Sequence, residues 1–170
     1  MNSVLKKCGG VFVLLQCLAV GMPVQAEEDV LPSRLMGLDL ARDIAQGAIA
    51  ACRKDGYQIS VVVTDRSGDA LVVMRDVFTS KYMTQLAHGK ANAVVLSNLS
   101  SAEVRVNMAR IKDELNLLEG VLLMEGGLPV RVAGSLIGAV GVSGAPGGDK
   151  DEACAQQGID AVQERLDFAD

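Results

Sequence analysis

Two runs of β-branched residues, separated by a short polar turn, constrain the fold of this chain more than any other feature. Residues 57–65 (YQISVVVTD) and 70–76 (ALVVMRD) each have the length and composition of a strand, and RSGD lies between them. Strands joined so closely pair as antiparallel neighbours, because a parallel pair needs a crossover of a dozen or more residues. The sequence therefore predicts a β-hairpin and, around it, a mainly antiparallel sheet.

Segments with helical periodicity surround this hairpin. Apolar residues recur at helical spacing over 38–56, 80–96, 100–118 and 149–166, and the third of these segments begins with a serine and a glutamate at capping-box spacing. Short apolar runs predict three more strands, over 120–125, 128–133 and 136–143. The order α-β-β-α-α-β-β-β-α predicts an α+β domain with a mainly antiparallel five-stranded sheet flanked by helices.

The first 26 residues have the pattern of a secretory signal. A positively charged start precedes an apolar stretch too short to span a bilayer stably, and the small residues of VQA suit a signal peptidase. We expect cleavage after Ala26, which leaves residues 27–170 as one domain in the periplasm or outside the cell. Cys17 suggests a lipoprotein signal as an alternative, but a small residue is expected before a lipid-modified cysteine, and Gln16 is not small.

Composition and cysteine content narrow the possible functions. The net charge is −5, aromatic residues make up 3% and tryptophan is absent, which disfavours nucleic-acid binding and its need for positive charge and stacking rings. No apolar run after the signal is long enough to span a membrane. Cys52 and Cys154 remain after cleavage. An even count in an exported protein permits one disulfide, and a buried free thiol in each helix is the alternative.

Residues 125–149 contain eight of the 18 glycines. Neither the dinucleotide fingerprint nor the phosphate loop ending in Gly-Lys-Ser/Thr is present, so we expect most of these glycines to form turns. Gly138 and Gly141 fall inside an expected strand instead. A glycine at such a position marks a bulge, or a place where another backbone or a flat ligand comes close.

Several segments, taken in order, resemble the GlcG/HbpS family, which also occurs as the C-terminal domain of PduO-type proteins. They are SVVVTDRSGDALVVMRD, KANAV, EGGLPV and GAVGVSGAPGGDKDEACAQQGIDAV, and the likeness covers about residues 38–162. The resemblance implies an antiparallel sheet flanked by helices and assembly into homo-oligomers. Several relatives bind haem, and others have no settled activity, so the resemblance predicts fold better than function.

The resemblance also implies a haem site on the second helix. Many relatives carry a histidine shortly before the Lys-Ala pair, where this chain has Tyr82. Tyr82 is then the expected ligand of haem iron, with His88 or Met83 as alternates, since a phenolate can hold ferric iron. Arg75 or Lys90 would pair with a propionate. Four glycines would give the flat ring room: Gly126, Gly127, Gly138 and Gly141.

We therefore expect an exported, homo-oligomeric haem-binding protein that stores or senses haem or iron. The tyrosine in place of the family histidine favours an alternative, an accessory protein that binds a small carboxylate through Arg75 and loop amides without haem. A haem-degrading enzyme is a further alternative, but the sequence offers no flavin or nicotinamide site and no convincing catalytic constellation. The last alternative is a structural oligomer packed through its glycine-rich strands.

Overall fold

The computed structural model describes residues 31–169. The predicted signal over residues 1–26 lies outside these residues. The chain divides into two units, Met1–Pro32 and Ser33–Asp170, and all helices and strands named below belong to the second. Among the described residues, every helix is too short or too polar to cross a membrane.

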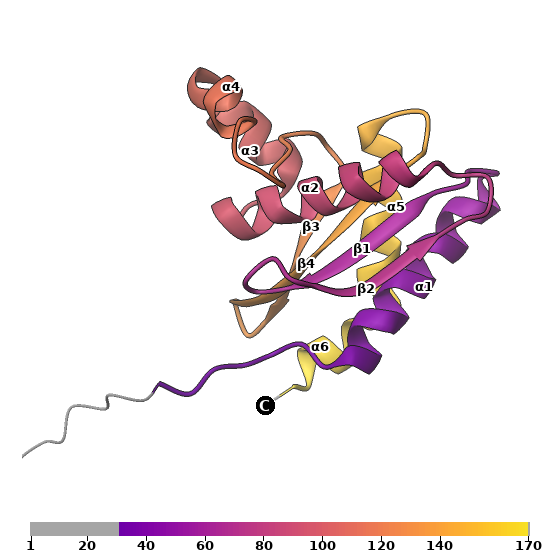
Figure 1. The fold of residues 1–170 in the computed structure, drawn as a ribbon. Helices are drawn as coiled ribbons and strands as arrows, with labels where there is room; N and C mark the ends of the chain where they lie inside the picture. The colour runs from indigo at the N-terminus through magenta and orange to yellow at the C-terminus, as the bar shows by residue number, and fades with distance from the viewer. Residues whose placement is uncertain (1–30, 170) are drawn as a thin grey trace, which may run out of the picture. The chain divides into compact units, whose positions relative to one another are not determined.

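The second unit is an α+β fold built on an antiparallel sheet with the strand order β2-β1-β4-β3 (Figure 1). The predicted hairpin is confirmed, since its two runs form adjacent strands with Val62 opposite Val73. The elements in chain order are α1 (Leu38–Lys54), β1 (Ser60–Asp65), β2 (Ala70–Arg75), α2 (Lys81–Ser97), α3 (Ser101–Asn107), the 3-10 turn η1 (Ala109–Ile111), α4 (Lys112–Leu115), β3 (Gly127–Val132), β4 (Ser135–Ser143), α5 (Gly148–Asp160) and α6 (Gln163–Asp167).

The sheet has four strands in the described residues, so the prediction of five is wrong. The segment 120–125 is not a strand because its backbone bonds to other partners. The amide of Leu122 donates to the carbonyl of Gly89 in α2 at 3.0 Å, and the amide of Leu123 donates to the side chain of Asn116 at 2.9 Å. Leu123 is buried in a small apolar cluster beside α2 and α3. Its hydrophobicity therefore reflects packing between helices, and periodicity alone does not distinguish that from a strand.

The two later helices are shorter than predicted. The capping box at Ser100 is present, but the helix it opens ends at Asn107 and is followed by η1 and the short helix α4. The last predicted helix is divided into α5 and α6. The break between them places Val162 and Leu166 together in the main core.

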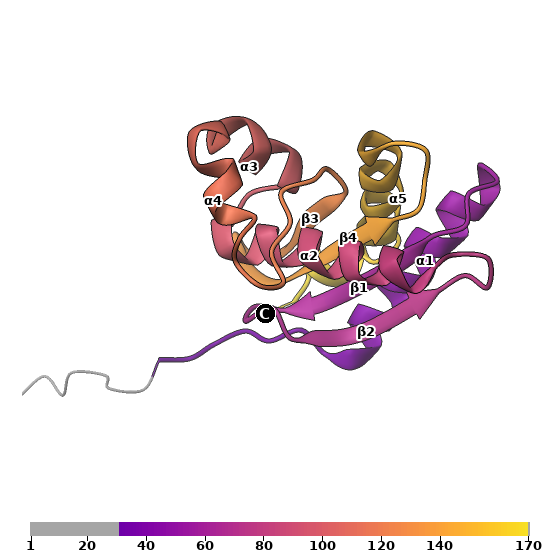
Figure 2. The same ribbon diagram turned by 45° about the horizontal axis from the view of Figure 1, so that its top comes forward.

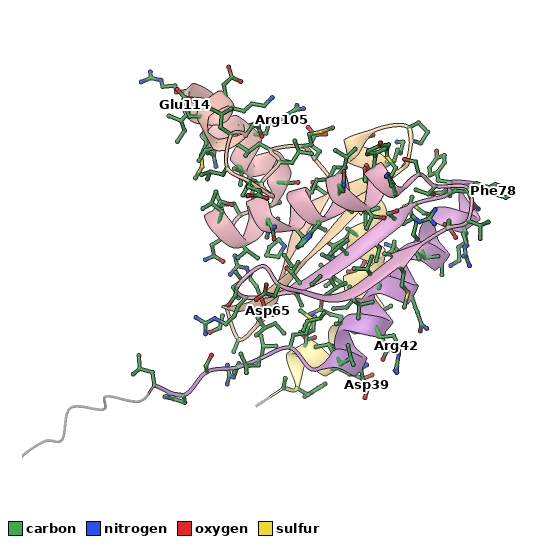
Figure 3. All side chains as sticks on the ribbon, viewed as in Figure 1. Asp39, Arg42, Asp65, Phe78, Arg105 and Glu114 are labelled. Carbon is green, nitrogen blue, oxygen red and sulfur yellow. A yellow bond between two sulfur atoms is a disulfide. The ribbon has the colours of Figure 1, made fainter. Side chains whose placement is uncertain are left out.

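Helices cover both faces of the sheet (Figures 1 and 2). On one face α1 and α5 pack against alternate residues of β1 and β4 and form the main core. On the other face α2 packs against β4, where Ala91 and Val94 contact Ala139. The helix α2 begins beside the loop that contains Phe78 and runs toward the β1–β2 turn, which follows Asp65 (Figure 3).

Candidate functional site

The start of α2 carries an exposed surface that combines apolar side chains with a phenol. Val77 and Phe78 in the preceding loop are 81% and 88% exposed, and Tyr82 in the first turn of the helix is 59% exposed. Figure 3 shows Phe78 at one extremity of the molecule. We call these three residues the Tyr82 surface. The ammonium of Lys81 lies 5.3 Å from the centre of the Tyr82 ring, so a positive charge accompanies the phenol.

The loop before α2 is fixed to the fold by Asp76 and Arg75. Asp76 is buried, and its carboxylate accepts hydrogen bonds from the amide of Ile59 at 3.1 Å and from the guanidinium of Arg53. The guanidinium of Arg75 donates to the backbone carbonyls of Asp76 and Thr79. These contacts hold the loop that presents the Tyr82 surface, and both come from one nitrogen of Arg75, Nη1.

Met83 follows Tyr82 but lies against the protein. Its sulfur accepts a hydrogen bond from the hydroxyl of Ser143 at 3.5 Å, and the neighbouring Thr84 exchanges one with Ser60 at 3.1 Å. These contacts connect the first turn of α2 to the ends of β4 and β1. The structure therefore places the phenol of Tyr82, rather than the sulfur of Met83, at the solvent-facing position.

His88 lies at a different place from the Tyr82 surface. Its Nε2 atom is 2.9 Å from the carbonyl oxygen of Gly68, in the turn between β1 and β2. That turn and the loop carrying Phe78 are at opposite ends of β2, so the structure does not bring His88 and Tyr82 together. Asp65 shapes the turn, because its carboxylate accepts the amide of Ser67 at 2.7 Å and a second turn amide at 3.1 Å.

Lys90 is buried in an ion pair and does not face a ligand. Its ammonium donates to a carboxylate oxygen of Asp151 at 2.7 Å and to the carbonyl of Val142 at 2.8 Å. The other carboxylate oxygen accepts the amide of Ala145 at 3.0 Å. Burial raises the pKa of Asp151, and the charge of Lys90 opposes that rise. The expectation that Lys90 pairs with a propionate is therefore corrected by the structure.

The four glycines expected to leave room for a ring are packed against protein atoms of the same chain. A Cβ added to Gly141 would lie 1.9 Å from the carbonyl oxygen of Ala87, and one added to Gly138 would lie 2.1 Å from that of Thr64. These glycines allow α2 and β1 to approach β4 closely. The same applies to the other two, Gly126 and Gly127, whose added carbons would meet atoms of Asp151 and Lys90.

Cys52 and Cys154 lie in α1 and α5, where the two helices pack together in the main core. Their Cα atoms are 5.4 Å apart, within the range that a disulfide spans. The pairing joins residues 102 positions apart in the sequence.

An acidic hollow of about 340 Å³ lies beside the start of α5 and is lined in part by Glu125, Asp149 and Glu152. One carboxylate oxygen of Glu152 is buried and has no hydrogen-bond partner among residues 31–169. Burial raises the pKa of this carboxyl group. Within the same residues, no group of three His, Cys, Asp or Glu side chains is arranged to hold a metal ion.

A family model described as "Haem degrading protein HbpS-like" matches residues 36–160. The chain belongs to the HbpS-like family. A comparison with curated protein sequences found no significant match.

Solved structures support the same assignment. A double mutant of Streptomyces reticuli HbpS is 33% identical, with a TM-score of 0.72, over 83% of this chain and 97% of its own. A second HbpS crystal structure is 32% identical, with a TM-score of 0.73, over 81% of this chain and 96% of its own. A complex of PduOC with haem is 23% identical, with a TM-score of 0.67, over 75% of this chain and 95% of its own, which shows a shared fold.

Sequence reasoning missed two residues that organise these sites. Asp76 follows the second strand as an ordinary strand-ending acid, and only the fold shows that it is buried beneath the loop before α2. Asn92 was detectable, because it lies four residues after His88 and such residues share one face of a helix. The side chains of His88 and Asn92 line one pocket together with the β1–β2 turn.

Proposed function

We propose that this member of the HbpS-like family is an exported, homo-oligomeric haem-binding protein, with Tyr82 as the ligand of the haem iron. The observation that carries the proposal is the exposed phenol of Tyr82 beside the apolar side chains of Val77 and Phe78. The family description names haem, and a protein of the same fold has been crystallised with haem.

The chemistry of the Tyr82 surface fits haem. A tyrosine oxygen is an established ligand of haem iron, and the ring of Phe78 offers an apolar contact to the flat macrocycle. Lys81 carries an ammonium beside the phenol, where it can pair with a propionate. Haem would supply an iron centre for ligand or redox chemistry. The residues of the chain would bind the group, orient it and neutralise its carboxylates.

Oligomerisation and export belong to the same proposal. Val77 and Phe78 can cover one face of a macrocycle, so a second copy of the chain would be needed to shield the other. Exposed apolar side chains grouped in this way are typical of interfaces. Export is supported by the predicted signal over residues 1–26, and a disulfide between Cys52 and Cys154 suits an oxidising compartment.

A small carboxylate bound at Arg75 receives less support from the structure. The guanidinium of Arg75 already donates to two backbone carbonyls in the loop before α2. A carboxylate would be left with the other two guanidinium nitrogens, Nε and Nη2, in the orientation that these contacts fix.

The direct test is a hemin titration of residues 27–170 followed by absorbance, with Tyr82→Phe and Tyr57→Phe as a matched pair of single-hydroxyl deletions. These are the only two tyrosines of the chain. We expect a saturable Soret shift in the wild type and in Tyr57→Phe, and its loss in Tyr82→Phe. A broad, non-saturating change in the wild type would exclude haem binding. Unchanged binding by Tyr82→Phe would exclude Tyr82 as the ligand, and His88→Ala would then show whether His88 serves instead.

Export and assembly have separate readouts. The protein recovered from the periplasm or medium should begin at residue 27 by intact mass, and a chain retained in the cytoplasm with its first 26 residues would contradict export. Light scattering should give a mass above that of one chain. Phe78→Ser should lower that mass or weaken hemin binding.

A further inference from the structure

The outer face of α2 forms the floor of a second pocket, of about 410 Å³, separate from the Tyr82 surface. His88, Asn92 and Val95 of α2 line it at helical spacing, the β1–β2 turn forms one wall, and Val121 forms the other. The volume is within the range of small-molecule sites, which run from roughly 300 to 1,000 Å³. Of the variants in the hemin titration proposed above, Tyr82→Phe and Tyr57→Phe lie outside this pocket, and only the follow-up variant His88→Ala changes one of its lining residues.

The pocket's own lining residues hold its walls. Nε2 of His88 contacts the carbonyl of Gly68 at 2.9 Å and secures the turn. The side-chain amide of Asn92 donates to the carbonyl of Gly120 at 2.9 Å and secures the opposite wall. These two contacts limit the conformational entropy that the walls lose when a ligand enters.

Two side chains of the pocket, Asn92 and Asp69, offer acceptor oxygens to a ligand. The side-chain oxygen of Asn92 is buried under Gly68 and has no hydrogen-bond partner within the described part of the chain. A small displacement of the glycine turn would expose this oxygen to the pocket. Asp69 adds a carboxylate to the lining. A buried acceptor without a partner is unfavourable, so a ligand that donates a hydrogen bond to it is favoured.

The charge of the pocket selects among such donors. The described residues that line it include Asp69 but no lysine or arginine. Arg66 of the same turn donates to the hydroxyl of Ser33 at 2.6 Å instead. A carboxylate ligand would therefore meet the negative charge of Asp69 with no lysine or arginine beside it. Val95 and Val121 give the remaining surface an apolar character suited to carbon chains or rings.

We propose that this pocket is a binding site for a small organic amine with an apolar body. The ammonium group would donate to the oxygen of Asn92 and to the carboxylate of Asp69. Its carbon portion would lie against Val95 and Val121. The site is independent of haem and extends the function of the chain to a second class of ligand.

The test is an amide NMR titration of haem-free residues 27–170, which include the whole compact unit Ser33–Asp170. Benzylamine is the probe, and benzoate, with the same ring and the opposite charge, is its control. We expect saturable shifts at Gly68, Asp69 and Val121 with benzylamine only. Equal binding of benzoate, or no saturable shift at these residues, would overturn the proposal.

Two variants locate the contact. Asp69→Asn removes one charge from an exposed turn and should weaken benzylamine binding about twofold to fivefold, the range of an exposed ion pair. Asp113→Asn makes the same change on α4 and should leave the affinity unaltered. Asn92→Leu should remove binding while the spectrum stays folded. If it unfolds, the comparison of Asp69→Asn with Asp113→Asn decides, and equal affinities in those two variants refute the assignment.

Discussion

The ammonium nitrogen of Lys90 lies 2.7 Å from a carboxylate oxygen of Asp151, and both side chains are buried. The pair joins the middle of α2 to the first turn of α5 across the end of β4. Each charged group also has a backbone partner, at Val142 for the ammonium and at Ala145 for the carboxylate. A buried pair with its remaining hydrogen bonds satisfied can be maintained, but removing either member leaves an uncompensated charge.

Replacing Asp151 with asparagine should therefore destabilise the fold strongly. The ammonium of Lys90 would stay buried without a counter-charge, at a cost of about 3–5 kcal/mol in the free energy of unfolding, measured by urea denaturation. Asp149→Asn is the matched control. Its carboxylate is on the surface beside Lys150, so its removal should cost at most about 1 kcal/mol.

The double variant Lys90→Met/Asp151→Asn completes this experiment. Removing both charges should recover part of the stability lost in the single variant, because no ion then remains unpaired. Strictly additive losses would show that the two groups do not act as a pair.

Glu152 should make stability depend on pH in a direction opposite to that of an ion-paired carboxylate. Burial raises the folded-state pKa of Glu152 above its ordinary value of 4.5, so folding favours the protonated form. The stabilising contribution is complete below pH 4.5 and is lost as the pH rises through the folded-state pKa. Glu152→Gln should therefore lose less stability than the wild type between pH 4 and pH 7.

The measurement is the free energy of unfolding at several pH values, with Glu164→Gln as a control because Glu164 is exposed in α6. Asp151 titrates in the same direction, so only the difference between wild type and variant isolates Glu152. Parallel pH profiles for the wild type and Glu152→Gln would contradict the prediction.

Gly141→Ala should destabilise the packing of α2 on the sheet. The added carbon would meet the backbone oxygen of Ala87, which cannot move without displacing the helix. Overpacking of this kind costs about 1–3 kcal/mol, and a backbone obstacle leads us to expect the upper part of that range. Gly37→Ala is the control, since no atom lies within 4 Å of its added carbon. Thermal unfolding of both variants provides the comparison.

Cys52 and Cys154 should form a disulfide when the protein is prepared under oxidising conditions. Alkylation of unfolded, unreduced residues 27–170 should label no thiol by mass, and labelling of both cysteines would refute the bond. Because the link closes a loop of 102 positions, its reduction should lower stability by roughly 4–5 kcal/mol in the chain-entropy description. The variant with both cysteines changed to alanine should unfold at the same lower temperature with or without reductant.

Local patterns predicted the elements whose own residues carry a clear signal. The hairpin of β1 and β2 is marked by its turn, and α1 is marked by an apolar stripe that the structure buries. The segment 120–125 was misassigned because its apolar side chains and its backbone amides are satisfied by α2 and Asn116 rather than by a strand. Such a choice between partners depends on the tertiary fold.

The candidate sites show the same limit. A lysine on a helix is ordinarily solvated, so the burial of Lys90 is understandable only together with Asp151, which lies 61 positions later. The spacing of Gly138 and Gly141 indicates close approach but not whether a ligand or a backbone approaches. In the structure a backbone approaches, because the carbonyl oxygens of Thr64 and Ala87 lie against Gly138 and Gly141 respectively. The family pattern predicted the position of Tyr82, whereas the exposure of its side chain is known only from the structure.

The large sequence separation between β1 and its partner β4 determines when during synthesis this sheet can form. Val62 stands opposite Gly141, whereas its other neighbour, Val73, is only a short turn away. The hairpin can therefore assemble soon after synthesis, but the central ladder must wait for residues that leave the ribosome near the end of the chain. Contacts between distant segments also form slowly, because the chain loses the entropy of closing a long loop before these contacts stabilise it. The edge of β1 that pairs with β4 thus stays unpaired through most of translation, an interval in which chaperones would meet a nascent chain that has not yet folded.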